Sequence, residues 1–408
     1  MQHILSNRLG EKLIWLLTTF LFAAFIIFET STWISVVLIV ITFAILFFDA
    51  LQGRGIIRPA IGPYHFFVLC FCLFCYASSL WARSADLAIS KGTTIFEILV
   101  CTSVIYMHYA KYETVAPLVE AIRWAGYIVV LYAFSFYGRE MIWNLASTGG
   151  RLMNSFANIN SIGMMAAYSA VITAFRVLFI NKRITWTDLF VIPTIVLIGL
   201  SGSRKTLVLA AAGFVILVMK RFGSKNIAKT VIQWSLLGVL ILVLFRFLLT
   251  LPIFEAVKAR MVGLIAMVTG VGEVDHSTWL RQQYIALGLE QFWKTPLLGI
   301  GIDNARFLVE TALGRRTYLH SNYVELLADG GIVGFFCYYV MYLYPLWIFY
   351  RYRRDRDPYL ILCVVLMLLF LVMDYGMVSY YSKSTYFYLS MLFLEARFLS
   401  DGNRERKL

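Results

Sequence analysis

The stretch His320-Ser-Asn-Tyr-Val-Glu-Leu-Leu-Ala-Asp-Gly330, followed by the apolar run of residues 331–350, decides the fold. A polar stretch over residues 251–330 leads up to this run, whereas the chain before residue 250 is mostly apolar. A run of about 20 mainly apolar residues can cross a bilayer as one helix. We therefore expect the chain to pass from water back into lipid just after Gly330.

The composition is typical of a membrane protein. Of the 408 residues, 60% are hydrophobic and 14% are charged, and the mean hydropathy is +0.76. A soluble domain is about 45–50% apolar and about 25% charged. The net charge of +13 is what cytoplasmic loops rich in Lys and Arg produce. No basic face with interleaved aromatic residues lies outside the apolar runs, so nucleic acid is not an expected partner.

The apolar runs predict an all-α, polytopic bundle of about 12 transmembrane helices, and we interpret residues 1–408 as a single integral membrane domain. A large, partly helical loop, residues 251–330, is expected between the ninth and tenth helices, on the outer face. The runs cover residues 13–29, 33–48, 64–81, 87–109, 115–136, 160–180, 187–201, 206–220, 230–250, 331–350, 359–378 and 384–400.

Loop charge predicts the orientation. With the N-terminus inside, the inner loops carry most of the Lys and Arg residues that lie outside the 251–330 loop. The positive-inside rule then places both termini in the cytoplasm. The fourth and fifth runs contain Lys91, Glu97, Glu120 and Arg123. We expect these four charged side chains to face the bundle interior or an interface, since contact with lipid would be costly.

Ser201-Gly-Ser-Arg-Lys205 separates the seventh and eighth runs at the outer face. Gly202 allows a tight turn, and Arg204 and Lys205 would begin the eighth helix. A guanidinium beside free helix N-terminal N–H groups favours a phosphate site. Basic side chains that anchor a helix at the membrane interface would give the same pattern.

The outer loop contains a predicted helix and several candidate anion-binding residues. Apolar side chains at helical spacing predict a helix over residues 278–293, ended by a turn at Pro296, Gly299 and Gly301. Arg281 is a candidate anion clamp on this helix. Its rivals are Lys258, Arg260, Arg306, Arg315 and Arg316, and composition alone does not choose among them.

His320 is the candidate general base. An imidazole titrates near neutral pH, which suits the removal of a proton from a hydroxyl. A structural histidine that is hydrogen-bonded in the loop is the alternative. His3, His65, His108 and His276 are weaker candidates. The sequence carries no metal-binding spacing and no P-loop, so we expect neither a metal nor a nucleotide-driven mechanism.

A third polar segment, Arg151-Leu-Met-Asn-Ser-Phe-Ala-Asn158-Ile-Asn160, precedes the sixth run at the outer face. Amide side chains there suit sugar hydroxyls, and they suit loop capping equally well.

Together these segments resemble the O-antigen polymerase/ligase family, the Wzy- and WaaL-type, GT-C-like membrane glycosyltransferases. The resemblance covers nearly the whole chain and depends on the order of the motifs, since each motif alone is weak. The matching regions are Arg151–Asn160, Ser203-Arg204, and an outer loop with Arg281, Pro296-Leu-Leu-Gly299-Ile-Gly301 and His320-Ser-Asn-Tyr323, followed by Gly331 and Gly334.

The resemblance implies a glycosyltransferase that works without cofactor or metal at the outer face of the bacterial inner membrane. The donor would be a glycan on undecaprenyl diphosphate, transferred with inversion to an acceptor hydroxyl. Arg204 and Arg281 would bind the diphosphate with help from Lys205, and His320 would act as the base. Arg151, Asn158, Asn160, Tyr323 and Glu325 are weaker candidates for binding substrate or orienting His320.

The acceptor separates two forms of this function. A polymerase extends another lipid-linked repeat unit, and a ligase transfers the glycan to lipid A-core. Lys205 favours the polymerase, because it adds charge where a second diphosphate could bind. A flippase or transporter of lipid-linked glycans and a non-catalytic scaffold are alternatives of other classes. A chain-length regulator and a flippase are further expected partners, besides the bilayer itself.

Overall fold

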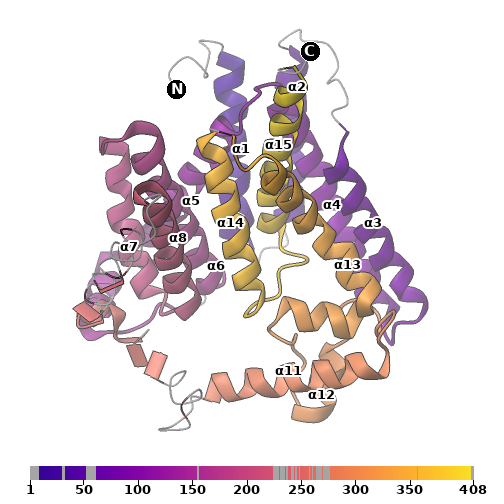
Figure 1. Cartoon of the computed structure of the whole chain (residues 1–408). Coiled ribbons are helices and arrows are strands. Elements are labelled where there is room, and N and C mark those ends of the chain that lie inside the picture. The colour runs from indigo at the N-terminus through magenta and orange to yellow at the C-terminus, as the bar shows by residue number, and fades with distance from the viewer. Residues whose placement is uncertain are drawn as a thin grey trace. The chain divides into compact units, whose positions relative to one another are not determined.

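A computed structural model describes residues 9–29, 33–51, 61–153, 156–223, 249–256, 276–355 and 357–405, with scattered positions between 229 and 269. These residues are mostly helical and none of them forms a strand, which confirms the all-α prediction (Figure 1). The helices are α1 (Leu9–Ile27), α2 (Ile34–Leu51), α3 (Pro63–Ala77), α4 (Ala85–Tyr109), α5 (Ala116–Thr148), α6 (Ile159–Phe175), α7 (Val191–Leu200), α8 (Arg204–Phe222), α11 (His276–Lys294), α12 (Arg306–Leu313), α13 (Asn322–Arg351), α14 (Pro358–Asp374) and α15 (Lys383–Glu405).

Six helical segments among the described residues are long and apolar enough to cross a membrane. They are Gly10–Ile27, Pro63–Leu80, Ala85–Tyr109, Ala116–Thr148, Ile159–Asn181 and Asn322–Arg351, and three shorter apolar helices are Ile39–Phe48, Trp186–Leu200 and Pro358–Asp374. The protein is therefore a helical membrane protein. The count of about twelve spans stays a prediction, because the ninth run, residues 230–250, lies largely outside the described residues.

Contacts divide the chain into two compact units. Unit 1 comprises residues 1–21, 35–119 and 276–408, and unit 2 comprises residues 22–34 and 120–275. In unit 1, α13 packs against α3 and α11, and α3 packs against α4. Rings fill the interface between α3 and α13, where Phe71 lies 5.3 Å from Tyr338 between ring centroids. In unit 2, α6 packs against both α7 and α8.

The charges predicted to face the bundle interior include a buried network in unit 2. Arg123 is 1% exposed. It binds Glu120 at 2.7 Å and Asp188 at 3.4 Å, and Arg176 binds the same Asp188 carboxylate at 2.9 Å. A buried charge is tolerated when it is paired in this way, since an unpaired charge in a low-dielectric interior is very costly.

Two details differ from the predicted runs. The helix α5 continues to Thr148, although Gly138 inside it has a non-helical backbone. The helix α13 begins at Asn322, whereas the apolar run begins at residue 331. The sequence Asp329-Gly-Gly331 resembles a helix stop, and the chain does change direction at Gly331, which has φ 59° and ψ −162°. Helical structure nevertheless continues on both sides of this kink.

The kink is held by the turn that follows α11. Main-chain bonds join the two segments, from Ile300 N to Ala328 O, Gly301 N to Asp329 O, Ile332 N to Pro296 O and Val333 N to Leu297 O, at 2.8–3.1 Å. A Cβ on Gly299 would lie 2.4 Å from the Asp329 backbone, and one on Gly331 would lie 2.4 Å from the Leu297 backbone. Both glycines are therefore required for backbone to meet backbone. The predicted turn at Pro296, Gly299 and Gly301 is confirmed.

Candidate functional site

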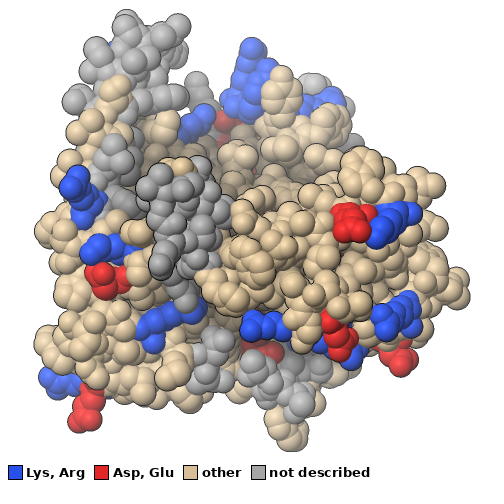
Figure 2. All heavy atoms as spheres, turned by 90° about the horizontal axis from the view of Figure 1, so that it is seen from below, with Lys and Arg blue, Asp and Glu red and all other residues tan. Residues whose placement is uncertain are grey.

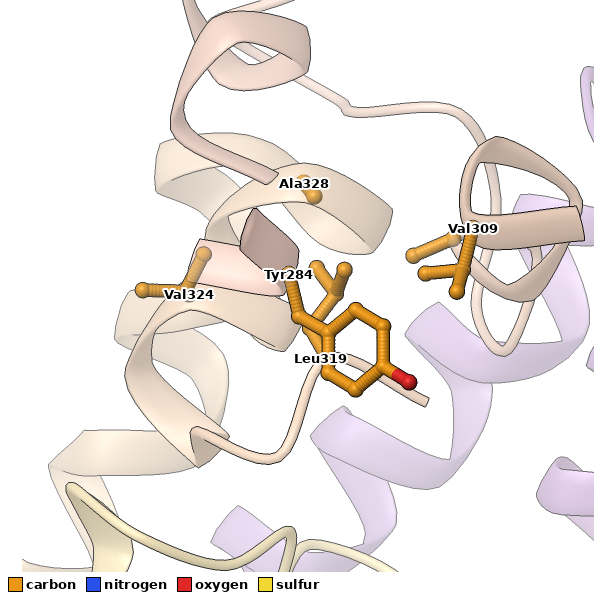
Figure 3. Packing of buried hydrophobic residues seen from close by; sticks show 6 residues of the cluster. Tyr284, Val309, Leu319, Val324 and Ala328 are labelled. Carbon is orange, nitrogen blue, oxygen red and sulfur yellow. The ribbon is translucent and has the colours of Figure 1, made fainter. Parts of the chain in front are cut away.

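An apolar cluster in unit 1 positions the His320 turn. The helix α11 matches the prediction for residues 278–293 closely, and its buried Tyr284 packs with Leu319, Val324 and Val309 (Figure 3). Figure 3 shows the Tyr284 ring beside Leu319, the residue immediately before His320. The cluster joins α11, α12 and the start of α13 into one support, shown at one end of unit 1 in Figure 1.

His320 lies between this support and the first turn of α13. Its imidazole stacks on the Tyr284 ring, with centroids 5.6 Å apart and planes 14° apart. The Tyr318 ring lies 4.2 Å from it on a tilted plane. The backbone of His320 has φ 60°, a left-handed conformation that is uncommon outside glycine and that often marks a functional constraint. The side chain is half-buried.

Glu325 fixes the backbone next to His320. Its carboxylate is fully buried, and its Oε2 accepts a hydrogen bond from Leu319 N at 2.5 Å. Among the described residues, its other oxygen, Oε1, has no hydrogen-bond partner. This carboxyl oxygen satisfies a backbone N–H group that would be costly to bury without a partner. Glu325 therefore positions the chain that carries the imidazole.

Tyr323 has a different role from the one expected. Its hydroxyl donates to Leu371 O at 2.7 Å, and its ring stacks on Tyr339 at 5.0 Å. These contacts tie α13 to α14. The prediction that Tyr323 orients His320 gains no support from them.

The asparagine of the His320-Ser-Asn-Tyr323 motif joins α13 to the loop between α14 and α15. Asn322 Oδ1 accepts hydrogen bonds from Ser379 N at 2.9 Å and from Tyr380 N at 3.0 Å. Its Nδ2 donates to Asp374 Oδ2 at 3.3 Å, and Asp374 Oδ1 accepts from the Ser379 hydroxyl. The loop thus has a fixed position beside the His320 turn.

That loop carries Tyr381, whose ring supports a cation from α4. Lys91 Nζ lies 3.7 Å from the Tyr381 ring centroid and 3.7 Å from Asp303 Oδ2. Burial raises the pKa of Tyr381 above its ordinary value, and the charge of Glu325 adds to the rise. Tyr381 therefore stays a neutral phenol at working pH. Such a face attracts an ammonium group.

Asp303 and Asp329 organise the segment before α12. Asp329 accepts from Asp303 N at 2.8 Å and from Ala305 N at 2.6 Å. The Asp303 side chain accepts from the Arg306 guanidinium. Burial lowers the pKa of Arg306, but the hydrogen bond to Asp303 and its charge raise it overall. Arg306 is therefore a cation committed to Asp303.

Arg281 lies one helical turn before Tyr284 on α11. Residues three apart share a helix face, so Arg281 belongs to the face that carries the ring under His320. Three of its rivals have carboxylate partners. Arg306 binds Asp303, Arg316 lies 3.9 Å from Glu310, and Lys258 lies 3.2 Å from Glu255. Arg315 is exposed. Arg260 lies outside the described residues.

The surface around α11 is mixed in charge. In Figure 2, which views the molecule from the α11 and α12 end, several basic side chains lie directly beside acidic ones. On α11, Lys294 and Glu290 form an ion pair at 2.7 Å. Exposed pairs of this kind contribute little to stability. On this face, the described residues do not form a simple basic patch.

Unit 2 brings together the candidate residues of two other motifs. Arg151 Nε donates to Ser201 O at 2.7 Å, and Arg151 donates through Nη2 to Asn160 Oδ1 at 3.1 Å. Asn158 caps α6, with its side chain accepting from Asn160 N at 2.9 Å. The capping alternative for Asn158 is therefore observed.

Arg204 and Lys205 are the first two residues of α8, as predicted. Ser203 is the N-cap, and Gly202 before it has φ 57°. The free N–H groups of a helix N-terminus attract anions. Arg151 contacts the turn that leads into this helix end through Ser201. The Arg151–Asn160 segment and the turn that leads into α8 are therefore one local structure.

The candidate residues thus form two sets. His320, Arg281 and Glu325 belong to unit 1, and Arg151, Asn160, Arg204 and Lys205 belong to unit 2. Sequence reasoning did not select Lys91, Asp303, Asp329 and Tyr381 as site residues. A charge inside an apolar run was the available signal for Lys91. Among the described residues, no group of three or more His, Cys, Asp or Glu side chains is arranged to hold a metal ion.

Apolar helices with a polar, histidine-bearing cluster at one end of unit 1 define a membrane protein with a candidate active site in that cluster. Residues 189–339 match the family model described as O-antigen ligase. The match contains α8 with Arg204, the whole of α11 and α12, and the His320 turn. Over these residues it confirms the resemblance to the O-antigen polymerase/ligase family, and the Arg151–Asn160 segment lies outside the match. No curated protein matches the chain.

Proposed function

We propose that this protein is a polymerase of bacterial cell-surface polysaccharide. It transfers a glycan from undecaprenyl diphosphate to a hydroxyl of another lipid-linked repeat unit. The observation that carries the proposal is the support of His320, which stacks on Tyr284 while its backbone is fixed through Glu325. This turn lies within the segment that matches the family. A general base needs such a fixed position relative to the hydroxyl it deprotonates.

In the proposed reaction, the acceptor hydroxyl oxygen attacks the anomeric carbon as His320 takes its proton. The bond from that carbon to the diphosphate oxygen breaks, and the lipid diphosphate leaves with the electron pair. Attack opposite the leaving group inverts the anomeric centre. Arg204 and Arg281, assisted by Lys205, stabilise the negative charge that gathers on the diphosphate. Activity should therefore persist in a chelator.

The alternative acceptor is lipid A-core, which would make the protein a ligase. The description of the matching family model supports this alternative, whereas the second cation at the start of α8, Lys205, supports the polymerase.

Reconstitution tests the proposal. Purified protein receives lipid-linked repeat units with and without lipid A-core, and the products are resolved by size. A ladder on the donor alone supports the polymerase. Transfer only to lipid A-core identifies a ligase and overturns the polymerase. If protein that is folded in the bilayer transfers no glycan under either condition, the proposal that it is a glycosyltransferase is overturned.

We also propose that both termini lie in the cytoplasm and that His320 lies at the outer face of the inner membrane. In a background without the native cysteines, Glu310→Cys should react with a thiol reagent that does not cross the inner membrane. The assay uses cells whose outer membrane has been made permeable and whose inner membrane is intact. Gly223→Cys should react only after the membrane is opened. The reverse pattern would refute this orientation.

A further inference from the structure

A cavity of about 540 Å³ lies in unit 1 between the starting end of α3 and the final turns of α4, α13 and α15. The helix α13 has 30 residues, beginning just after His320 and ending at Arg351 in the cavity wall. At 1.5 Å per residue, the helix is roughly 40 Å long, even with its kink. The cavity therefore lies at the opposite end of the bundle from His320.

Two guanidinium groups line this cavity, on Arg351 and Arg397, together with one carboxylate, on Asp401. The charge of these three groups sums to +1. Arg397 Nε lies 3.3 Å from Asp401 Oδ2, and both side chains are accessible to solvent. An exposed pair is worth about 0–1 kcal/mol, so Arg397 can exchange this partner for an incoming anion at little cost.

Aromatic side chains make up much of the remaining wall, beside aliphatic and small residues from the start of α3 and the ends of α13 and α15. Tyr344 and Phe393 stack with their centroids 5.5 Å apart and their planes 9° apart. Trp347, 54% exposed, lies beside the Arg351 guanidinium at 5.6 Å. Trp and Tyr gather at the level of the lipid headgroups, where one end of the ring meets lipid and the other meets water. The cavity thus combines the marks of a membrane–water boundary with a local excess of positive charge.

Arg353 and Arg354 follow directly after α13 and are exposed. They add positive potential near the mouth without lining the cavity. Guanidinium forks suit phosphate oxygens through paired, charge-assisted hydrogen bonds. Pockets for small ligands occupy about 300–1,000 Å³, and basic pockets between helices at a membrane surface suit anionic headgroups.

We propose that this cavity binds the phosphate headgroup of an anionic membrane lipid, held by Arg351 and Arg397. The aromatic walls contact the glycerol and the first acyl carbons. The site is independent of the glycan-transfer chemistry, because it lies at the other end of α13. A soluble phosphate ester offers the same anionic group, so the test must separate the two sources.

The test uses purified full-length protein in nanodiscs of phosphatidylcholine, titrated with phosphatidylglycerol and followed by native mass spectrometry. The variant pair Arg351→Gln with Arg397→Gln should weaken phosphatidylglycerol binding by tenfold or more. The matched control, Arg353→Gln with Arg354→Gln, removes the same charge from the neighbouring turn and should change binding by less than threefold. Thermal unfolding verifies that each variant is folded.

The pair Arg351→Lys with Arg397→Lys keeps the charge but loses the guanidinium forks. Its binding should lie between that of the wild type and that of the Gln pair, which excludes a loss through misfolding. Equal phosphatidylglycerol binding by the Gln pair and the wild type would overturn the site. If the control pair loses as much phosphatidylglycerol binding as the Gln pair, the binding depends on general surface charge, and this result would overturn the site as well. Glycerol 3-phosphate that binds as tightly as the lipid would overturn the lipid as the ligand.

Discussion

The Tyr284 ring lies parallel to the His320 imidazole, 5.6 Å away between centroids, so that α11 supports the turn before α13. Tyr284→Phe keeps this stacking and should leave stability and transfer close to wild type. Tyr284→Ala removes the ring from a buried cluster and should cost about 3–5 kcal/mol, as other buried aromatic truncations do. Unfolding in detergent and transfer assays check both variants, and a Phe variant as impaired as the Ala variant would contradict a packing role.

His320 combines a left-handed backbone with the proposed proton transfer, and two substitutions separate these features. Asn tolerates φ near 60°, so His320→Asn should fold normally while transfer falls about 10²–10⁴-fold, the usual contribution of a general base. His320→Gly also accepts this φ and leaves space, so added imidazole should restore part of the activity. The matched control is His276→Asn at the start of α11. Full activity of His320→Asn would refute the role of the base.

Arg204 and Arg281 are proposed to bind the same diphosphate. Loss of either guanidinium, by substitution with Gln, should lower kcat/KM about 10²–10³-fold. If both act on one leaving group, the loss in the double variant should be smaller than the product of the two single losses. Arg315→Gln, an exposed rival, is the control. A fully multiplicative double variant would indicate that the two residues act independently.

Glu325 should act through the backbone at Leu319. Glu325→Gln keeps an acceptor oxygen and should retain most of the activity. Glu325→Ala leaves the Leu319 N–H buried without a partner, which costs about 1–3 kcal/mol. The shift of His320 that follows should lower kcat up to about 100-fold while KM changes little. A Gln variant as impaired as the Ala variant would instead indicate that the Glu325 carboxyl group participates directly.

The close approach of Gly331 to the turn after α11 gives a prediction about stability, for which Gly314 is the control. Gly331→Ala places a methyl group 2.4 Å from the Leu297 backbone at φ 59°, so strain and crowding should together cost about 2–5 kcal/mol. Gly314→Ala has a similar φ of 67°, with nothing within 4 Å of the added carbon, and should cost about 1–2 kcal/mol. Thermal unfolding compares the two, and equal costs would show that crowding at Gly331 is relieved.

The helices could be predicted where a segment showed either a continuous apolar run or a clear helical periodicity. Apolar runs marked the spans, and helical periodicity marked α11 almost to its ends. The position of Arg204 at the start of α8 followed from the Gly202 turn. The beginning of α13 at Asn322 could not be predicted, because Asp329-Gly-Gly331 gives the signal of a helix end and only the turn at Pro296 compensates for the break.

The candidate site was partly predictable for a related reason. Residue type and local sequence made His320 and Arg204 candidates in advance, whereas only the resemblance to a known family favoured Arg281 over the other basic residues of the outer loop. The pairing of Lys91 with Asp303, which is far from it in the sequence, depends on how α4 packs. The same is true of Asn322, whose partners in the loop at residues 379 and 380 come from tertiary structure.

Four hydrogen bonds join the turn from Pro296 to Gly301 to α13, and all four run between main-chain atoms. Its spacing of proline and glycines is therefore a rule of backbone geometry, and it leaves the side chains at residues 297, 298 and 300 outside that rule. Chains that handle unrelated sugars could keep the turn unchanged and vary those side chains freely. In a new sequence, this spacing would identify the architecture that presents the histidine, and sugar preference would have to be sought at other positions.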